Sequence, residues 1–406
     1  MKNLLHSLCV AMAGISLYAQ TPATISMGTN SANDAFFKLE TGTESTFEAA
    51  TWDLAFLRTS NFSIGIRTND HKGVEVYEVG ALSTWETVDP ASITTYTRLY
   101  NSETSWETGA FDQGSATYGW GEYQMASHQV VGSLVSMLKQ GTQFYKFKMG
   151  NFYGGYTFTY SVYDGTAWGE DQTMTVPNTA TTNRFFNYVH LNSGEIVVAE
   201  PENTAWDFVA TKYLTDYFGD GSMMYGVTGI LVHPSIEVAE RAADAGETQL
   251  ADLTFSEDIN TIGWNWKTYS GGVYSVDSNR QFFLKDANDQ VYRIVFTGYS
   301  GSATGNISFN YENVTEQLDA QTFEGGRFAA YPNPTNGALS IVLDRTLAGE
   351  AVIELVDLRG ALVKRETINS GGFAEVQWDL SSYSKGVYLV KVQVGAQQQL
   401  QKIVLQ

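Results

Sequence analysis

Residue types that could perform chemistry are few in this chain, and their spacing matches no common catalytic motif. The sequence contains five histidines and one cysteine. It contains no G-x-S-x-G, H-E-x-x-H, P-loop or G-x-G-x-x-G motif. Residues 298–302 approach the serine motif, but no helix is expected after them. We therefore expect a protein that is not an enzyme, although paired carboxylates for glycoside hydrolysis need no such motif.

Residues that could bind a soft metal are scattered. His71, His190 and His233 lie far apart in sequence, and Met223-Met224 follow a Gly-rich loop. Imidazole and thioether groups ligate haem iron, and both axial ligands must project into one apolar cleft. A cleft between two domains could combine some of these residues, since such clefts are favoured ligand sites.

Charge and composition limit the partners. The chain has 406 residues, a formal net charge of −20 and a pI near 4.6. Nucleic-acid binding needs a basic surface, so we expect no nucleic-acid partner. An acidic chain also has no electrostatic attraction to anionic lipid. No internal apolar run is long enough for a transmembrane span.

The N-terminus has the pattern of a signal peptide, which we expect over residues 1–19. Lys2 supplies the positive charge, residues 4–19 are mostly apolar, and Ala19 is a plausible cleavage position. Cleavage there removes Cys9, the only cysteine. The mature chain then has no thiol and no disulfide, and its stability depends on packing.

The region between the two termini is duplicated with a period of roughly 150 residues. Five segments recur in the same order. They are 36–39 with 185–188, 51–56 with 205–210, 118–121 with 262–265, 145–147 with 292–294, and 155–160 with 305–311. The drift in spacing indicates loop insertions and deletions.

Each copy has the alternation of antiparallel strands. Apolar residues alternate with polar ones over 156–162 and 307–311, and 284–292 has the pattern of a hairpin. The best helix candidate is 236–245. The sequence predicts a mainly β fold with two tandem antiparallel β-rich domains, over 24–178 and 179–318, and a small C-terminal β-sandwich.

The duplicated unit resembles the HmuY family of haem-binding proteins. The resemblance rests on the Trp-Asp strand, the Gly-Trp pair and the final hairpin strands, and copy 1 is the more diverged. It implies surface domains that capture haem through two axial His or Met ligands. One family ligand follows the Gly-Trp pair closely, which points to Met125 and His128 in copy 1. Residues 264–270 of copy 2 contain neither type, and neither copy offers the second ligand.

The last 76 residues, 331–406, resemble the type A C-terminal sorting domain of the type IX secretion system. The resemblance rests on segments 331–337, 356–360, 386–392 and 401–406. It implies a partnership with the type IX secretion machinery, export across both membranes, and a final place at the cell surface or outside the cell. Alternation at 339–343 and 390–394, with turn residues at 357–360, predicts the small sandwich. Residues 319–330 are the expected linker.

Two functions remain open from sequence. The first is an exported binding protein that captures haem or another small apolar ligand. The second is a non-catalytic structural or adhesive surface protein that has lost haem binding. The axial ligand pair is the feature that distinguishes them, and its absence from copy 2 favours the second function for that copy.

Overall fold

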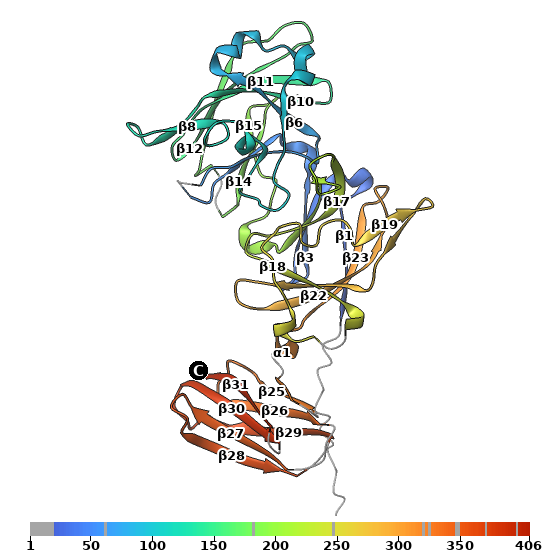
Figure 1. The fold of residues 1–406 in the computed structure, drawn as a ribbon, viewed down its shortest axis with the longest axis vertical. Coiled ribbons are helices and arrows are strands. Elements are labelled where there is room, and N and C mark those ends of the chain that lie inside the picture. The colour runs from blue at the N-terminus through green and yellow to red at the C-terminus, as the bar shows by residue number, and fades with distance from the viewer. Residues whose placement is uncertain are drawn as a thin grey trace, which may run out of the picture. The chain divides into compact units, whose positions relative to one another are not determined.

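The computed structural model describes residues 20–60, 63–180, 183–245, 248–318, 321–323, 326–345, 350–369, 372–394 and 397–406. The described residues form two compact units, one up to Asp244 with Thr254–Glu312, the other Ala245–Leu253 with Asn313–Gln406. Antiparallel strands dominate both, which confirms the mainly β fold class (Figure 1). Among the described residues α1 (Thr315–Leu318) is the only α-helix. The expected signal peptide, 1–19, lies outside them.

The first unit contains two lobes, and lobe A spans residues 52–200. An eight-stranded sheet with the path β13-β12-β11-β10-β6-β7, to which β8 and β9 are attached, packs on a four-stranded sheet of order β15-β14-β4-β5. The strands are β4 (Leu54–Leu57), β5 (Ile66–Thr68), β6 (Val74–Ala81), β7 (Thr97–Leu99), β8 (Gly121–Gln124), β9 (Gln129–Gly132), β10 (Leu134–Gln140), β11 (Gln143–Phe152), β12 (Gly155–Val162), β13 (Gln172–Pro177), β14 (Phe186–His190) and β15 (Glu195–Val197).

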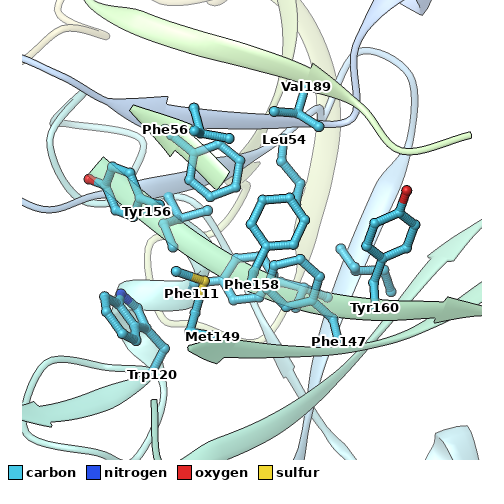
Figure 2. Packing of buried hydrophobic residues seen from close by; sticks show 14 of the residues in the cluster. Leu54, Phe56, Phe111, Trp120, Phe147, Met149, Tyr156, Phe158, Tyr160 and Val189 are labelled. Carbon is cyan, nitrogen blue, oxygen red and sulfur yellow. The ribbon is translucent and has the colours of Figure 1, made fainter. Parts of the chain in front are cut away.

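Aromatic side chains from both sheets fill the core of lobe A (Figure 2). Phe56 of the small sheet stacks on Phe158 of the large one, with ring centroids 5.3 Å apart. Tyr156, Phe158 and Tyr160 alternate with less buried threonines, as the sequence pattern predicts. This alternation buries one face of β12 and leaves the other to water.

Lobe B consists of residues 20–51, 201–244 and 254–312. A sheet of order β1-β23-β22-β21-β18 packs on a sheet of order β17-β16-β2-β3, and β19 and β20 form a separate hairpin. The strands are β1 (Thr21–Ser26), β2 (Asn33–Lys38), β3 (Thr43–Glu48), β16 (Phe208–Asp216), β17 (Met224–Val232), β18 (Glu237–Ala242), β19 (Lys267–Ser270), β20 (Val273–Val276), β21 (Arg280–Lys285), β22 (Val291–Tyr299) and β23 (Asn306–Asn313).

The two lobes have corresponding strand orders, but the chain crosses between them. In lobe B, β1 and β2 from the first half of the sequence pair with β23 and β16 from the second half. The corresponding strands of lobe A are β13 and β14, which pair with β12 and β4. The halves are therefore interleaved. The expected copies 24–178 and 179–318 both contribute to each lobe, and they lie in one compact unit.

Matching hydrogen bonds relate the two halves residue by residue. The carboxylate of Asp53 accepts the N–H of Leu191 at 2.8 Å, and the carboxylate of Asp207 accepts the N–H of Leu39 at 2.7 Å. Leu39 therefore corresponds to Leu191. It follows that the Phe36-Phe37 pair corresponds to residues 188–189 and not to 185–186.

A second correspondence also differs from the one expected. The carbonyl of Trp120 accepts the N–H of Ser133 at 3.1 Å, and the carbonyl of Trp266 accepts the N–H of Asp277 at 3.0 Å. Each tryptophan directly precedes a hairpin and is buried. The counterpart of Trp120 is thus Trp266, two residues beyond the expected Trp264.

The helix expected over 236–245 is wrong, because β18 (Glu237–Ala242) occupies most of this segment. β18 pairs with β21 along its whole length, and Val238 is fully buried. Pairing with a neighbouring strand overrides the helix propensity of the Ala and Glu residues here. The hairpin expected at 284–292 is confirmed by β21 and β22.

The second unit contains a β-sandwich, as expected. Its sheets have the orders β24-β25-β26-β29 and β28-β27-β30-β31, with one apolar core between them. The strands are β24 (Gln321–Phe323), β25 (Gly326–Tyr331), β26 (Ala338–Arg345), β27 (Ala351–Asp357), β28 (Leu362–Ile368), β29 (Gly372–Asp379), β30 (Gly386–Val394) and β31 (Gln397–Leu405). β24 and all of β25 except Tyr331 fall within 319–330, the expected linker, and β25 pairs with β26.

Candidate ligand-binding surfaces

The β8–β9 hairpin of lobe A carries both expected site residues. Gln124 pairs with Gln129, so Met125 and His128 lie in the connection at the hairpin tip. Trp120 precedes β8 and is 3% exposed within the core of lobe A. The hairpin therefore projects from a fixed base.

The structure separates the two expected ligands. Met125 is 82% exposed and is not among the residues that line the neighbouring pocket. His128 does line this open pocket, which has a volume of about 660 Å³. The other lining residues are mostly apolar or aromatic, namely Ile64, Tyr118, Tyr123, Val130, Phe152, Tyr153 and Gly154. The volume falls in the range of small-molecule and cofactor sites.

A hydrogen bond joins two side chains of this pocket. Oη of Tyr123 lies 2.8 Å from Nδ1 of His128. His128 has φ of 54°, a left-handed conformation, and its N–H donates to the carbonyl of Gln124 at 2.9 Å. The tight turn thus directs the imidazole back to the phenol. Sequence reasoning considered only His and Met here and missed Tyr123, whose signal is its place on the strand before the turn.

The donor set of this pocket fits a haem held from one side. Phenol and imidazole groups are both used as haem iron ligands in proteins. Tyr123 and His128 lie on one hairpin and bond to each other, so together they offer one axial ligand and its hydrogen-bond partner. An opposed pair of ligands, as the family resemblance implies, is not what this hairpin provides.

Lobe B carries an equivalent hairpin, β19–β20, with a different chemistry. Tyr269 lies three residues after Trp266, as Tyr123 lies three residues after Trp120. Tyr269 is 64% exposed and pairs across the hairpin with Tyr274, with ring centroids 4.8 Å apart. The hairpin contains no His or Met. A tyrosine is thus the feature that the two hairpins share.

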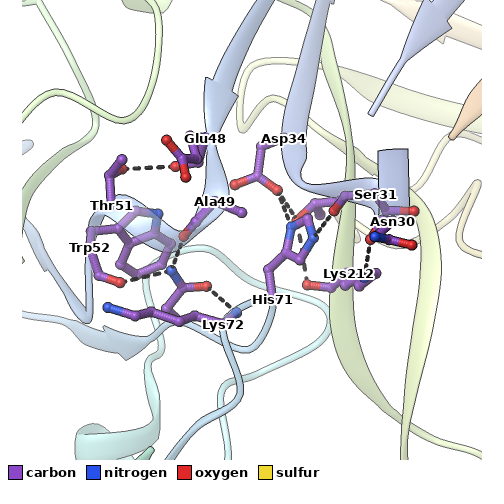
Figure 3. A network of polar contacts seen from close by, with 12 residues as sticks. Asn30, Ser31, Asp34, Glu48, Ala49, Thr51, Trp52, His71, Lys72 and Lys212 are labelled. Carbon is purple, nitrogen blue, oxygen red and sulfur yellow. Dashed lines mark hydrogen bonds and ion pairs between the residues drawn. The ribbon is translucent and has the colours of Figure 1, made fainter. Parts of the chain in front are cut away.

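A polar network joins the two lobes (Figure 3). Nδ1 of His71 in lobe A lies 2.7 Å from the carboxylate of Asp34 in lobe B, and its Nε2 lies 2.6 Å from the carbonyl of Ser31. The imidazole thus connects lobe A to two oxygen atoms of lobe B. Thr211 donates to the same carboxylate at 2.6 Å.

A cavity of about 70 Å³ lies between the lobes beside this network. Trp52, Trp106 and Trp206 line it, together with Tyr188 and Glu200. Burial raises the pKa of the Glu200 carboxyl to about 7, and the N–H of Phe186 and the hydroxyl of Tyr188 oppose this shift. The cavity has room for a few water molecules and is far too small for a porphyrin.

The other described histidines each contact a different set of partners. Both ring nitrogens of His71 have partners, and His190 bonds Ser193 at 3.1 Å. His233 packs edge-on against Trp206, and its Nδ1 accepts the N–H of Ser235 at 3.0 Å. Among the described residues, no three His, Cys, Asp or Glu side chains are arranged to hold a metal ion.

Comparison with known proteins assigns the C-terminal unit. Residues 329–406 match the family model of the secretion system C-terminal sorting domain. This segment is a sorting domain. It begins two residues before the expected boundary at 331, and it indicates export to the outer-membrane surface or secretion by the type IX system. No helix among the described residues is long and apolar enough to span a membrane.

The solved structures that are similar to this chain are distant from it. A candidate lipoprotein of Bacteroides fragilis has 21% identity over 31% of this chain and 82% of its own, with a TM-score of 0.14. A pullulanase of Bacillus acidopullulyticus has 10% identity over 93% of this chain and 32% of its own, also with a TM-score of 0.14. No curated protein matches the sequence.

Proposed function

We propose that this chain is an exported, non-catalytic binding protein that captures haem in the pocket beside the β8–β9 hairpin. The observation that carries the proposal is the 2.8 Å contact between Tyr123 and His128 within a pocket of about 660 Å³. An imidazole that accepts the phenol proton increases the negative charge on the phenol oxygen, which makes it a stronger ligand for ferric iron.

The walls of the pocket support the same ligand. Tyr118, Phe152 and Tyr153 offer ring faces, and Tyr153 is 69% exposed. Aromatic faces stack well against a flat conjugated macrocycle, and this contact removes apolar surface of the macrocycle from water, which is favourable. The resemblance to the HmuY family points to the same ligand class. The ligation differs from the family, because a Tyr–His pair takes the place of two opposed His or Met ligands.

A haem titration of the mature full-length chain tests this proposal. We expect a saturable Soret shift with a high-spin spectrum, because the pocket supplies one axial ligand. Tyr123→Phe removes the ligand oxygen and should abolish the shift. His128→Asn keeps the left-handed turn, which Asn tolerates, and removes the imidazole. It should weaken binding about tenfold, as loss of a hydrogen-bond partner of an iron ligand does.

Two matched variants serve as controls. Tyr269→Phe makes the same change in the lobe B hairpin and should leave the titration unchanged. Met125→Leu should also leave it unchanged, because this side chain is 82% exposed. A low-spin spectrum that Met125→Leu converts to high spin would instead identify Met125 as a second axial ligand. A titration without saturation, or one unaffected by Tyr123→Phe and His128→Asn, would overturn the proposal.

A second candidate function, a structural or adhesive surface protein, is favoured by lobe B. Its β19–β20 hairpin presents Tyr269 and Tyr274 without a histidine or methionine. An exposed pair of rings can bind a partner without a metal. If haem fails to bind, this function remains for the whole chain.

A further inference from the structure

We propose that lobe B binds a neutral polysaccharide on an exposed aromatic surface formed by the β16–β17 and β19–β20 hairpins and the segment before β19. We call it the lobe B aromatic surface. Its rings are those of Tyr217, Phe218, Tyr225, Trp264, Tyr269 and Tyr274. The proposal is independent of haem capture, which concerns lobe A.

The exposure of this surface is unusual within its lobe. Phe218 and Tyr269 are each 64% exposed, Tyr225 is 49% exposed and Tyr217 is 45% exposed. Every large hydrophobic residue that is exposed in the described part of lobe B lies on these two hairpins, Met223 and Val273 included. Single exposed apolar residues need no explanation, but a contiguous group marks an interaction site.

Contacts between the rings hold the surface in place. Tyr217 stacks on Trp264 with centroids 5.4 Å apart, and it meets Tyr225 edge-on at 5.6 Å. On the other hairpin, Tyr274 packs edge-on against the half-buried Tyr299 at 4.7 Å. Rings that are already ordered lose little conformational freedom when a ligand binds.

The two hairpins form one surface. The backbones of Ile230 in β17 and Gly263 exchange hydrogen bonds of 2.9 and 3.2 Å. Tyr217 of the first hairpin also stacks on Trp264, which lies in the segment before β19. The ammonium of Lys267, at the start of β19, donates to the carbonyls of Thr228 and Trp264, which fixes the second hairpin on the first.

Ring chemistry favours a sugar chain over an aliphatic partner. Most of these side chains are tyrosines, which combine an apolar face with a hydroxyl. A sugar ring also has both apolar and polar groups. Its C–H groups can lie on the negative face of an aromatic ring, and its hydroxyls can form hydrogen bonds with phenols and carboxylates. Asp220 lies exposed at the tip of the β16–β17 hairpin and provides such an acceptor.

Charge favours a neutral chain. Asp216 and Asp220 repel polyanions, and the whole protein has a formal net charge of −20. Lys267 does not compensate, because it is 7% exposed and its ammonium bonds backbone carbonyls. Nucleic acids, sulfated glycans and anionic lipids are therefore disfavoured.

Affinity electrophoresis tests the proposal with the mature full-length chain. Native gels would contain hydroxyethylcellulose, xylan, laminarin or amylopectin, and a gel with heparin would serve as the polyanion control. We expect retardation by at least one neutral polysaccharide and none by heparin. Tyr269→Ala and Phe218→Ala should each weaken binding about tenfold, since one aromatic contact contributes roughly that factor. Phe373→Ala, which removes an equally exposed aromatic side chain of the sorting domain, is the matched control.

Three outcomes would overturn the proposal. The first is the absence of retardation by all four neutral polysaccharides. The second is retardation that Tyr269→Ala and Phe218→Ala leave unchanged while both proteins keep the wild-type unfolding temperature. The third is a concentration-dependent dimer, seen by analytical ultracentrifugation and abolished by Tyr269→Ala, which would assign the surface to a second copy of the chain.

Discussion

Asp53 and Asp207 form matching buried ion pairs, one in each lobe of the first unit. Asp53 lies 2.7 Å from the ammonium of Lys72, and Asp207 lies 2.7 Å from that of Lys38. The two carboxylates are 2% and 6% exposed. Each also accepts a backbone N–H from the half of the sequence that crosses into its lobe. The two carboxylates therefore hold the interleaved strands together.

Removal of either carboxylate should destabilise the protein strongly. Asp53→Ala leaves a buried ammonium and a buried backbone N–H without partners, and Asp207→Ala does the same in lobe B. We expect each to lower the free energy of unfolding by about 3 kcal/mol. Urea denaturation at pH 7 measures this change. The half-exposed pair of Glu237 with Lys285 is the control, and Glu237→Ala should cost less than about 1 kcal/mol.

Glu200 should make the protein less stable as the pH rises. Burial raises the pKa of this carboxyl from 4.5 to about 7, so the folded state keeps a proton that the unfolded state releases above pH 4.5. The stability of the wild type relative to Glu200→Gln should therefore fall between about pH 4.5 and 7, and stay constant above pH 7. Chemical denaturation at several pH values measures the difference.

The exposed neighbour Glu202 provides the control for this experiment. Glu202→Gln removes an exposed carboxyl from the same segment and should change stability only slightly. A difference between wild type and Glu200→Gln that does not vary with pH would contradict the assignment of a raised pKa to Glu200.

His233 should act in the opposite direction. Burial, with the charge of Lys38, lowers the pKa of this imidazole from 6.5 to about 4. Between about pH 6.5 and 4 the unfolded state therefore binds a proton at this imidazole and the folded state does not. The free energy of unfolding then falls as the pH drops from about 6.5 to 4. In His233→Asn this loss should disappear, while the Asn oxygen can still accept the N–H of Ser235. His190→Asn makes the same change at a less buried position and is the matched control.

The sorting domain yields a prediction about location. Deletion of residues 329–406 should leave the protein inside the cell envelope of a host that has the secretion system, because the export signal is lost. Immunoblots of envelope, surface and medium fractions measure this. Fusion of residues 329–406 to an unrelated reporter should move the reporter out, and a truncated chain that still reaches the surface would contradict the prediction.

Sequence reasoning was most successful where chemistry is local. The strand alternation of 156–162, the hairpin at 284–292 and the turn at 357–360 all appear in the structure, because side-chain periodicity and turn residues determine them. The exchange of strands between halves was not predictable, because repeats with similar apolar patterns can pair within or between copies with similar contacts. The expected correspondence between the two halves was also wrong at one place. Residues 36–37 were matched to 185–186 because both are Phe-Phe, but they correspond to 188–189, three residues further on.

The candidate site could be predicted only in part. The position of the hairpin followed from Trp120, and His128 does line a pocket. Tyr123 was missed because its role depends on a left-handed residue at the turn, and sequence gives no direct sign of such a conformation at a histidine. The lobe B aromatic surface was missed because its rings come from segments far apart in sequence.

The interleaved order of strands also determines when each lobe can form. Lobe A is continuous in the chain and can close as soon as it has been made. β1, β2 and β3 must wait for β16 to β23, and the gap from β3 to β16 is roughly 160 residues, or about 10–30 s of synthesis. During that time β2, the apolar strand around Phe36 and Phe37, pairs only with β3, and the edge that will pair with β16 stays open. A nascent chain of this protein therefore carries an open strand edge at its leading end, and it needs protection from aggregation until its second half arrives.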